Sequence, residues 1–150
     1  MYKPCFGLAA AQQLGADVVE GMLQHVLRQC DAQGLKSVCG LAGAAQISRE
    51  GVTALFRQAL GYAANHYLYG NVAECVTHLS CLLGARQLDA AAVCALLTDA
   101  VMAQDSVVVA ALCSLPAAAS VSAGMLQELK QLAARNADAG TFEALSRLQI

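Results

Sequence analysis

Residues 19–27 of the chain read VEGMLQHVL, and their spacing decides the predicted fold. Apolar side chains stand at positions 19, 22, 23, 26 and 27, which places them on one face of an α-helix. The same spacing returns at 52–60 (VTALFRQAL), at 93–101 (VCALLTDAV) and, more weakly, at 126–133 (LQELKQLA). No segment alternates apolar and polar residues over the length of a strand. The sequence therefore predicts an all-α chain.

The helical face recurs at a nearly regular interval. Its four copies begin at positions 19, 52, 93 and 126, so they are 33, 41 and 33 residues apart. A second helical pattern lies between them, in Leu35-x-x-Val38-Cys39 and again within 72–79, 108–115 and 142–148. Periods of roughly 20–50 residues are typical of stacked helical hairpins. We therefore expect a right-handed α-α superhelix, or solenoid, of about four antiparallel helix pairs.

The predicted units follow from capping residues and helix breakers. They span approximately residues 15–47, 48–88, 89–121 and 122–150, and residues 1–14 form an N-terminal extension or a partial helix. A side-chain oxygen before a helix accepts a hydrogen bond from the first turn, and this predicts N-caps at Ser48, Asn71, Asp89, Ser122 and Thr141. The breakers that separate helices are predicted at Gly34, Gly70, Gly84, Pro116 and Gly140.

Composition and charge exclude several classes of protein. At 57% hydrophobic and 13% charged residues, the 150-residue chain is unlike a disordered protein and long enough for one domain with a substantial core. Its 9 basic and 11 acidic residues give a net charge of −2, which removes the field on which nonspecific nucleic-acid binding relies. The longest apolar run, 107–119, contains Ser114 and Pro116 and is shorter than the roughly 18 residues of a membrane span.

The cysteines indicate a reducing compartment. There are seven, with no Cys-x-x-Cys pair, so they cannot form a fully paired disulfide framework. Unpaired cysteine is usually a small buried hydrophobe, and we expect Cys39, Cys75, Cys94 and Cys113 to be packing residues. The expected location is intracellular, in the mitochondrial matrix or the cytosol.

Two strings resemble a known kind of repeat. Residues 38–48 (VCGLAGAAQIS) and 79–89 (LSCLLGARQLD) each run from a Leu/Ala-rich helix through a short turn to a polar cap. They resemble degenerate units of the octotricopeptide and heptatricopeptide repeats, the pentatricopeptide-like arrays of organellar RNA-associated proteins. This resemblance implies an organellar protein that binds RNA or belongs to a ribonucleoprotein such as a mitochondrial ribosome.

Few residues suggest chemistry. Cys75-x-x-His78-x-x-Cys81 places three possible zinc ligands on one helix, but a fourth would have to come from elsewhere, and packing is the simpler interpretation. No phosphate-binding loop, nucleophile elbow or Ser/His/Asp set is present in the sequence. We therefore expect a protein that is not an enzyme and needs no cofactor.

Partner contacts are predicted at the tyrosine-rich stretch 62–70, in the unit that is longer than its neighbours. Tyrosine is enriched at interface hot spots, so the candidate partner-binding residues are Tyr62, His66, Tyr67 and Tyr69. If RNA binds directly, bases would stack on tyrosine and phosphates would meet Arg28, Arg57 or Arg86. Leu145, Leu148 and Ile150 leave the last helix apolar, which indicates a longer array or a docking end.

Together these features predict a non-catalytic scaffold or adaptor subunit of a larger assembly, whose partners are other protein subunits. Two alternatives stay open. One is a direct RNA-binding repeat factor, and the other is a peripheral subunit of a membrane complex.

Overall fold

The computed structural model describes residues 14–64 and 71–149 of the chain. Within these ranges the chain forms helices and turns and contains no strand, so the expected all-α class is confirmed. No helix in the described part is both long enough and apolar enough to cross a membrane. Residues 1–13 of the predicted N-terminal extension lie outside the described residues.

The helices come in successive pairs, a longer one followed by a shorter one. The four pairs are α2 (Ala16–Arg28) with α3 (Ala32–Cys39), α4 (Arg49–Ala64) with α5 (Asn71–Ser80), α7 (Ala90–Met102) with α8 (Ser106–Cys113), and α9 (Ala123–Arg135) with α10 (Ala139–Ser146). A short helical segment follows each pair: η1 (Ala42–Gln46), α6 (Leu83–Arg86), η2 (Pro116–Ser120) and η3 (Arg147–Gln149). The longer helices begin 33, 41 and 33 residues apart, as the apolar pattern predicted.

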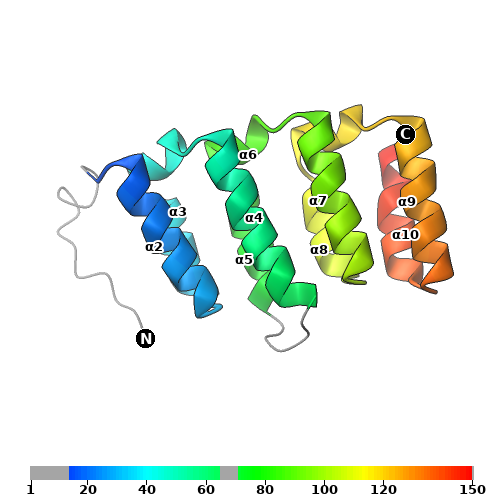
Figure 1. The fold of residues 1–150 in the computed structure, drawn as a ribbon, viewed down its shortest axis with the longest axis horizontal. Coiled ribbons are helices and arrows are strands. Elements are labelled where there is room, and N and C mark those ends of the chain that lie inside the picture. The colour runs from blue at the N-terminus through cyan, green and yellow to red at the C-terminus, as the bar shows by residue number, and fades with distance from the viewer. Residues whose placement is uncertain (1–13, 65–70, 150) are drawn as a thin grey trace.

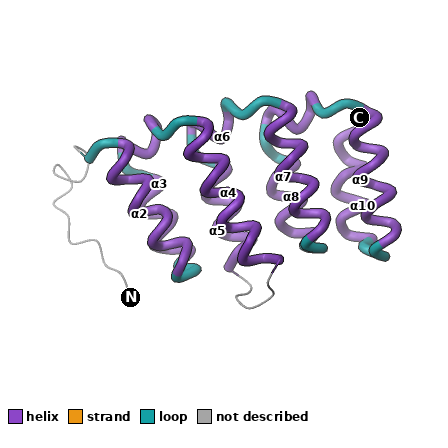
Figure 2. Tube along the Cα trace, in the orientation of Figure 1, coloured by secondary structure: helices purple, strands orange, loops and turns teal. Residues whose placement is uncertain are grey.

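The pairs lie side by side in chain order and form two layers (Figure 1). In the first layer, α2 packs against α4, α4 against α7, and α7 against α9. In the second layer, α3 packs against α5, α5 against α8, and α8 against α10. The short segments and the loops joining them run along one edge of both layers (Figure 2). We call these the first and second layers below.

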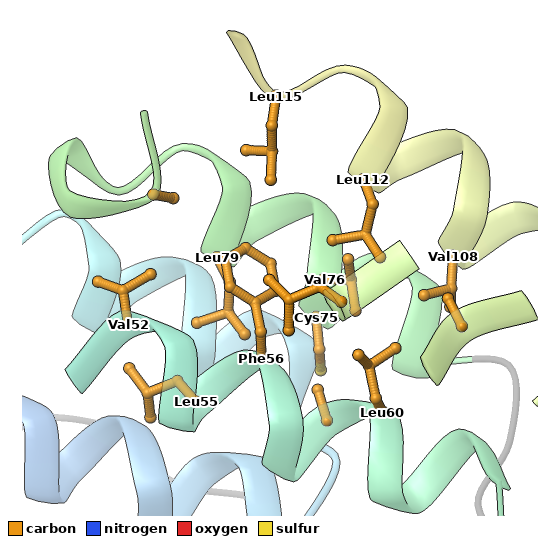
Figure 3. Close-up of a cluster of buried hydrophobic side chains, with 14 of the residues drawn as sticks. Val52, Leu55, Phe56, Leu60, Cys75, Val76, Leu79, Val108, Leu112 and Leu115 are labelled. Carbon is orange, nitrogen blue, oxygen red and sulfur yellow. The ribbon is translucent and has the colours of Figure 1, made fainter. Parts of the chain in front are cut away.

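The predicted apolar faces form the buried core between the layers. In α4, for example, Val52 and Phe56 are fully buried. The equivalent residues of the other longer helices are buried as well, and all are apolar except Lys130 in α9. The Phe56 ring lies among side chains from α5 and α8, including Val76 and Leu112 (Figure 3). Each pair therefore buries its apolar surface mainly against its neighbours in the chain.

The turns inside three pairs share one geometry. Cys30, Gln104 and Ala137 have φ of 50°, 57° and 55°, the left-handed conformation that commonly ends a helix. The next residue is an aspartate in each case, Asp31, Asp105 and Asp138, and its carboxylate accepts hydrogen bonds from backbone N–H groups in the first turn of the shorter helix.

This turn corrects three sequence predictions. Thr141 is not an N-cap: it lies inside α10, fully buried, and donates to the Asp138 carboxylate at 2.5 Å. Gly34 and Gly140 are not breakers either, because they lie within α3 and α10. The predicted caps Ser48, Asp89 and Ser122 are confirmed, with side-chain oxygens 2.8–3.2 Å from backbone N–H groups.

Close packing requires glycine at two equivalent positions in the short segments. A Cβ atom on Gly43 would lie 2.5 Å from the Leu14 carbonyl oxygen, and one on Gly84 would lie 2.9 Å from the Ile47 carbonyl oxygen. Both contacts are with the backbone that leads into the longer helix of the same pair. Glycine at these positions therefore lets the short segment pack directly against the backbone at the start of the longer helix.

We predict that Gly43→Ala lowers the free energy of unfolding by about 1–3 kcal/mol, because the added methyl group meets backbone that cannot rotate away. Gly21→Ala is the control, since a Cβ there meets nothing within 4 Å and alanine favours the interior of α2. It should raise stability by up to about 1 kcal/mol. Urea denaturation measures both, and equal effects of the two substitutions would contradict the packing argument.

We also predict that Ala137→Gly stabilises the protein by about 0.5–1 kcal/mol, because glycine adopts positive φ without the penalty that Cβ imposes. Ala134→Gly, an exposed position in the last turn of α9, should instead destabilise by up to about 1 kcal/mol. Thermal or urea unfolding of the two variants tests this. A destabilising effect of Ala137→Gly would contradict the argument that the positive φ of Ala137 costs the folded chain stability.

Candidate interaction surface

The exposed side of the first layer is hollowed on both sides of α7. Between α7 and α9 lie two adjoining hollows of about 550 and 370 Å³, which share Thr98 and Met125 and which we call the α7/α9 groove. The larger is lined mainly by small or apolar residues: Ala90, Ala91, Cys94, Ala95, Val121 and Met125. The smaller adds Glu128 and Arg135 at the other end of α9.

The sequence of α7, AAAVCALLTDAVM, explains this groove. Val93, Leu96 and Leu97 face the core and are fully buried, so core packing holds the helix in position. Its outward positions carry Ala91 and Ala95, which are exposed and too short to fill the space beside α9. Met125 of α9 remains 38% exposed at the side of this groove. An apolar partner side chain could occupy the space and be removed from water there.

A second pair of hollows lies between α4 and α7, with volumes of about 490 and 390 Å³. We call it the α4/α7 groove. Arg57 lines both hollows and Arg49 lines the larger one, whereas Glu50, Asp89 and Asp99 supply carboxylates. Within residues 14–64 and 71–149, an ion pair joins Glu143 of α10 to Arg147 at the start of η3, and none joins Arg49 or Arg57 to a carboxylate.

The arginines predicted to contact RNA do not gather on one surface. Arg57 lines the α4/α7 groove, but Arg28 is in the last turn of α2 and Arg86 is in α6. The C-terminal end of α2 and the segment α6 lie at opposite edges of the molecule (Figure 1). Arg49, which the RNA prediction did not include, is the arginine that shares a hollow with Arg57.

The tyrosine-rich stretch is mostly beyond what the structure describes. Tyr62 lies in the last turn of α4, while His66, Tyr67 and Tyr69 lie outside the described residues. Their role in partner binding stays a prediction. At the other end of the chain, Leu145 is fully buried and Leu148 is half-buried, and Ile150 is also outside the described residues.

The possible zinc ligands do not converge. Cys75 is buried, whereas Cys81 is exposed and its thiol is 3.6 Å from the carbonyl oxygen of Thr77. In the described ranges no three His, Cys, Asp or Glu side chains are arranged to hold a metal ion. Cys39, Cys94 and Cys113 are half-buried and pack against the core, consistent with the expectation that these cysteines are packing residues.

Burial changes the acidity of the inner thiols. It raises the pKa of both Cys39 and Cys75 from 9.0 to about 12, and neighbouring thiols and carboxylates add to the effect. A thiol with so high a pKa is almost entirely protonated at neutral pH and is a poor nucleophile or metal ligand. These two residues therefore suit packing better than chemistry.

The chain matches no family model, and no curated protein and no solved structure is significantly similar to it. Its resemblance to the octotricopeptide and heptatricopeptide arrays therefore stays a prediction from the sequence pattern.

The raised thiol pKa values predict how stability depends on pH. The folded chain keeps these protons up to about pH 12, whereas the unfolded chain releases them near pH 9. Their contribution to stability is therefore complete below pH 9 and is lost as pH rises towards 12. We expect Cys39→Ala to reduce the alkaline fall in the urea midpoint relative to that of the unsubstituted chain. An unaltered fall in Cys39→Ala would exclude this linkage.

Proposed function

We propose that this protein is a non-catalytic scaffold, a right-handed superhelix of helix pairs that binds a partner protein across α7. The observation that supports this is the position of the two grooves, one on each side of a single exposed helix. Protein interfaces commonly combine an apolar centre with a charged rim. The α7/α9 groove supplies the first, and Arg49 and Arg57 with nearby carboxylates supply the second.

The alanines of α7 favour a polypeptide as the occupant. Ala91 and Ala95 present little more than backbone, so a partner segment can approach α7 closely. The hollows on either side can then each take a side chain from the segment that crosses it. Exposed alanines also have no side-chain rotamers to immobilise, which lowers the entropic cost of binding.

Direct RNA binding is the second candidate, and Arg49 and Arg57 in the α4/α7 groove favour it. A phosphate near these guanidinium groups would also be near Glu50, Asp89 and Asp99. Asp89 is occupied as the N-cap of α7, but its charge remains. Because carboxylates repel phosphate, we place protein binding first. The proposal of an organellar ribonucleoprotein as the assembly rests on the sequence resemblance alone.

The scaffold function is tested by placing a charge in the apolar groove. Ala95→Glu puts a carboxylate at the α7/α9 groove, whereas Ala110→Glu makes the same change at an exposed alanine on α8, in the second layer of the same pair. We expect the tagged full-length chain to purify with a reproducible set of proteins from its native cells. Ala95→Glu should lower their recovery at least tenfold, and Ala110→Glu should not.

Nuclease treatment separates the alternatives. The scaffold function is supported if the co-purified proteins are still recovered after RNase treatment and are lost in Ala95→Glu. Partners released by RNase, together with salt-dependent binding of an RNA oligonucleotide that weakens in Arg57→Glu, would replace it with RNA binding. Equal recovery with the two alanine variants would remove the α7/α9 groove from the proposal.

A further inference from the structure

The side chain of Gln58 ties α4 to α2, and its counterpart between α4 and α7 cannot do so. Gln58 is the tenth residue of α4, and its amide donates a hydrogen bond to the Gln24 carbonyl oxygen at 3.1 Å. The tenth residue of α7 is Asp99. An ionised carboxylate has no hydrogen to donate, so Asp99 cannot bond to the carbonyl oxygen of Arg57, the counterpart of Gln24. Arg57 and Asp99 instead line one hollow of the α4/α7 groove.

A second contact is lost at the same step. In the first two longer helices, Glu20 lies so close to Gly51 that a Cβ atom on the glycine would be 2.9 Å from a carboxylate oxygen. The corresponding residues of α4 and α7 are Thr53 and Ala92, which line the other hollow of the groove. The Thr53 hydroxyl donates to the Arg49 carbonyl oxygen of its own helix at 2.8 Å. The α4/α7 groove is therefore open where the chain departs from the pattern that joins α2 to α4.

The walls of this groove carry opposite charges. Arg57 on α4 and Asp99 on α7 are both exposed and line the same hollow of about 390 Å³. Within residues 14–64 and 71–149, no ion pair joins these two side chains. A segment with one acidic and one basic side chain would pair with both walls. A polyanion, in contrast, would gain the contact with Arg57 and be repelled by Asp99.

The two grooves flank α7 at the neighbouring residues Thr98 and Asp99. Thr98 lines both hollows of the α7/α9 groove, and Asp99 lines the α4/α7 groove. One turn earlier, the exposed Ala95 forms part of the outward surface of the helix. Packed helices lie about 8–10 Å apart, a distance that about three residues of extended chain span. A segment that crosses α7 here passes the α7/α9 groove first, then Asp99, then Arg57.

We propose that the partner segment carries an apolar, a basic and an acidic residue in this order, read from either end. The apolar side chain enters the α7/α9 groove, the basic one pairs with Asp99, and the acidic one pairs with Arg57. The charges thereby fix which residues of the segment lie over which groove. This inference rests on the proposed scaffold function and adds to it the chemistry of the segment that α7 binds.

Selection from a peptide library tests this order. A phage-displayed library of random dodecapeptides is selected on the immobilised full chain, and the enriched peptides are synthesised with a fluorescent label. We expect them to contain apolar, basic and acidic residues in the stated order. Fluorescence anisotropy should show that their affinity falls at least tenfold in Ala95→Glu, because the added carboxylate stands where the segment crosses α7.

Charge exchange identifies the two ion pairs. The double variant Arg57→Glu, Asp99→Lys keeps the net charge but inverts the walls, so it should weaken binding of the selected peptides at least tenfold. A peptide whose basic and acidic residues are exchanged should regain affinity for this variant. The matched control is Glu143→Arg with Arg147→Glu, which inverts an exposed ion pair outside the first layer and should leave binding unchanged. Circular dichroism verifies that all variants remain folded.

The outcomes separate this inference from the scaffold proposal. Peptides that depend on Ala95 but are insensitive to the charge exchange would overturn the inference and leave the scaffold intact. Enriched peptides with the acidic residue in the middle, or with charges of one sign only, would overturn it as well. Binding of an RNA oligonucleotide that weakens in Arg57→Glu would make RNA the occupant instead. A selection that enriches no peptide, or only peptides unaffected by Ala95→Glu, would count against both proposals.

Discussion

The structure depends on lateral burial between successive helix pairs. Val93 and Leu112, for example, are fully buried in an apolar cluster to which helices of all four pairs contribute. The side-chain amide of Gln58 on α4 donates a hydrogen bond to the Gln24 carbonyl oxygen of α2 at 3.1 Å, which adds a polar link between these two longer helices. Because apolar contact is the main attraction, the position of each helix is set by the volume of its neighbours' side chains.

The same constraint explains what sequence reasoning could predict. Burial on one side of a helix imposes the 3.6-residue period, so the apolar faces and the starts of the longer helices were readable from spacing alone. The shorter helices were predicted less accurately from the sequence. Their caps, Asp31, Asp105 and Asp138, follow a residue with positive φ that is Cys, Gln or Ala, and no glycine marks the turn. Gly34 and Gly140 were misread as breakers for that reason.

The candidate surface was harder to predict because it depends on tertiary gaps. Whether Ala91 and Ala95 leave a groove is decided by the separation of α7 from α9, which no local pattern encodes. The arginines illustrate the same limit. Arg28, Arg57 and Arg86 were grouped by residue type, yet α2, α4 and α6 place them on separate parts of the molecule. A signal was nevertheless present, since Ala91 and Ala95 lie outside the predicted apolar face of α7.

Departures from the repeating pattern are therefore the most informative residues in this chain. The second residue of the longer helix is acidic in α2 (Asp17) and in α4 (Glu50), and an acidic residue near a helix start is favourable. In α7 the second residue is Ala91. Folding requires no apolar residue at this exposed position, and solubility would favour a charge. In α9 the opposite change occurs, because Lys130 stands where the other pairs bury an apolar side chain. Burial in the core therefore does not by itself account for Ala91 or for Lys130.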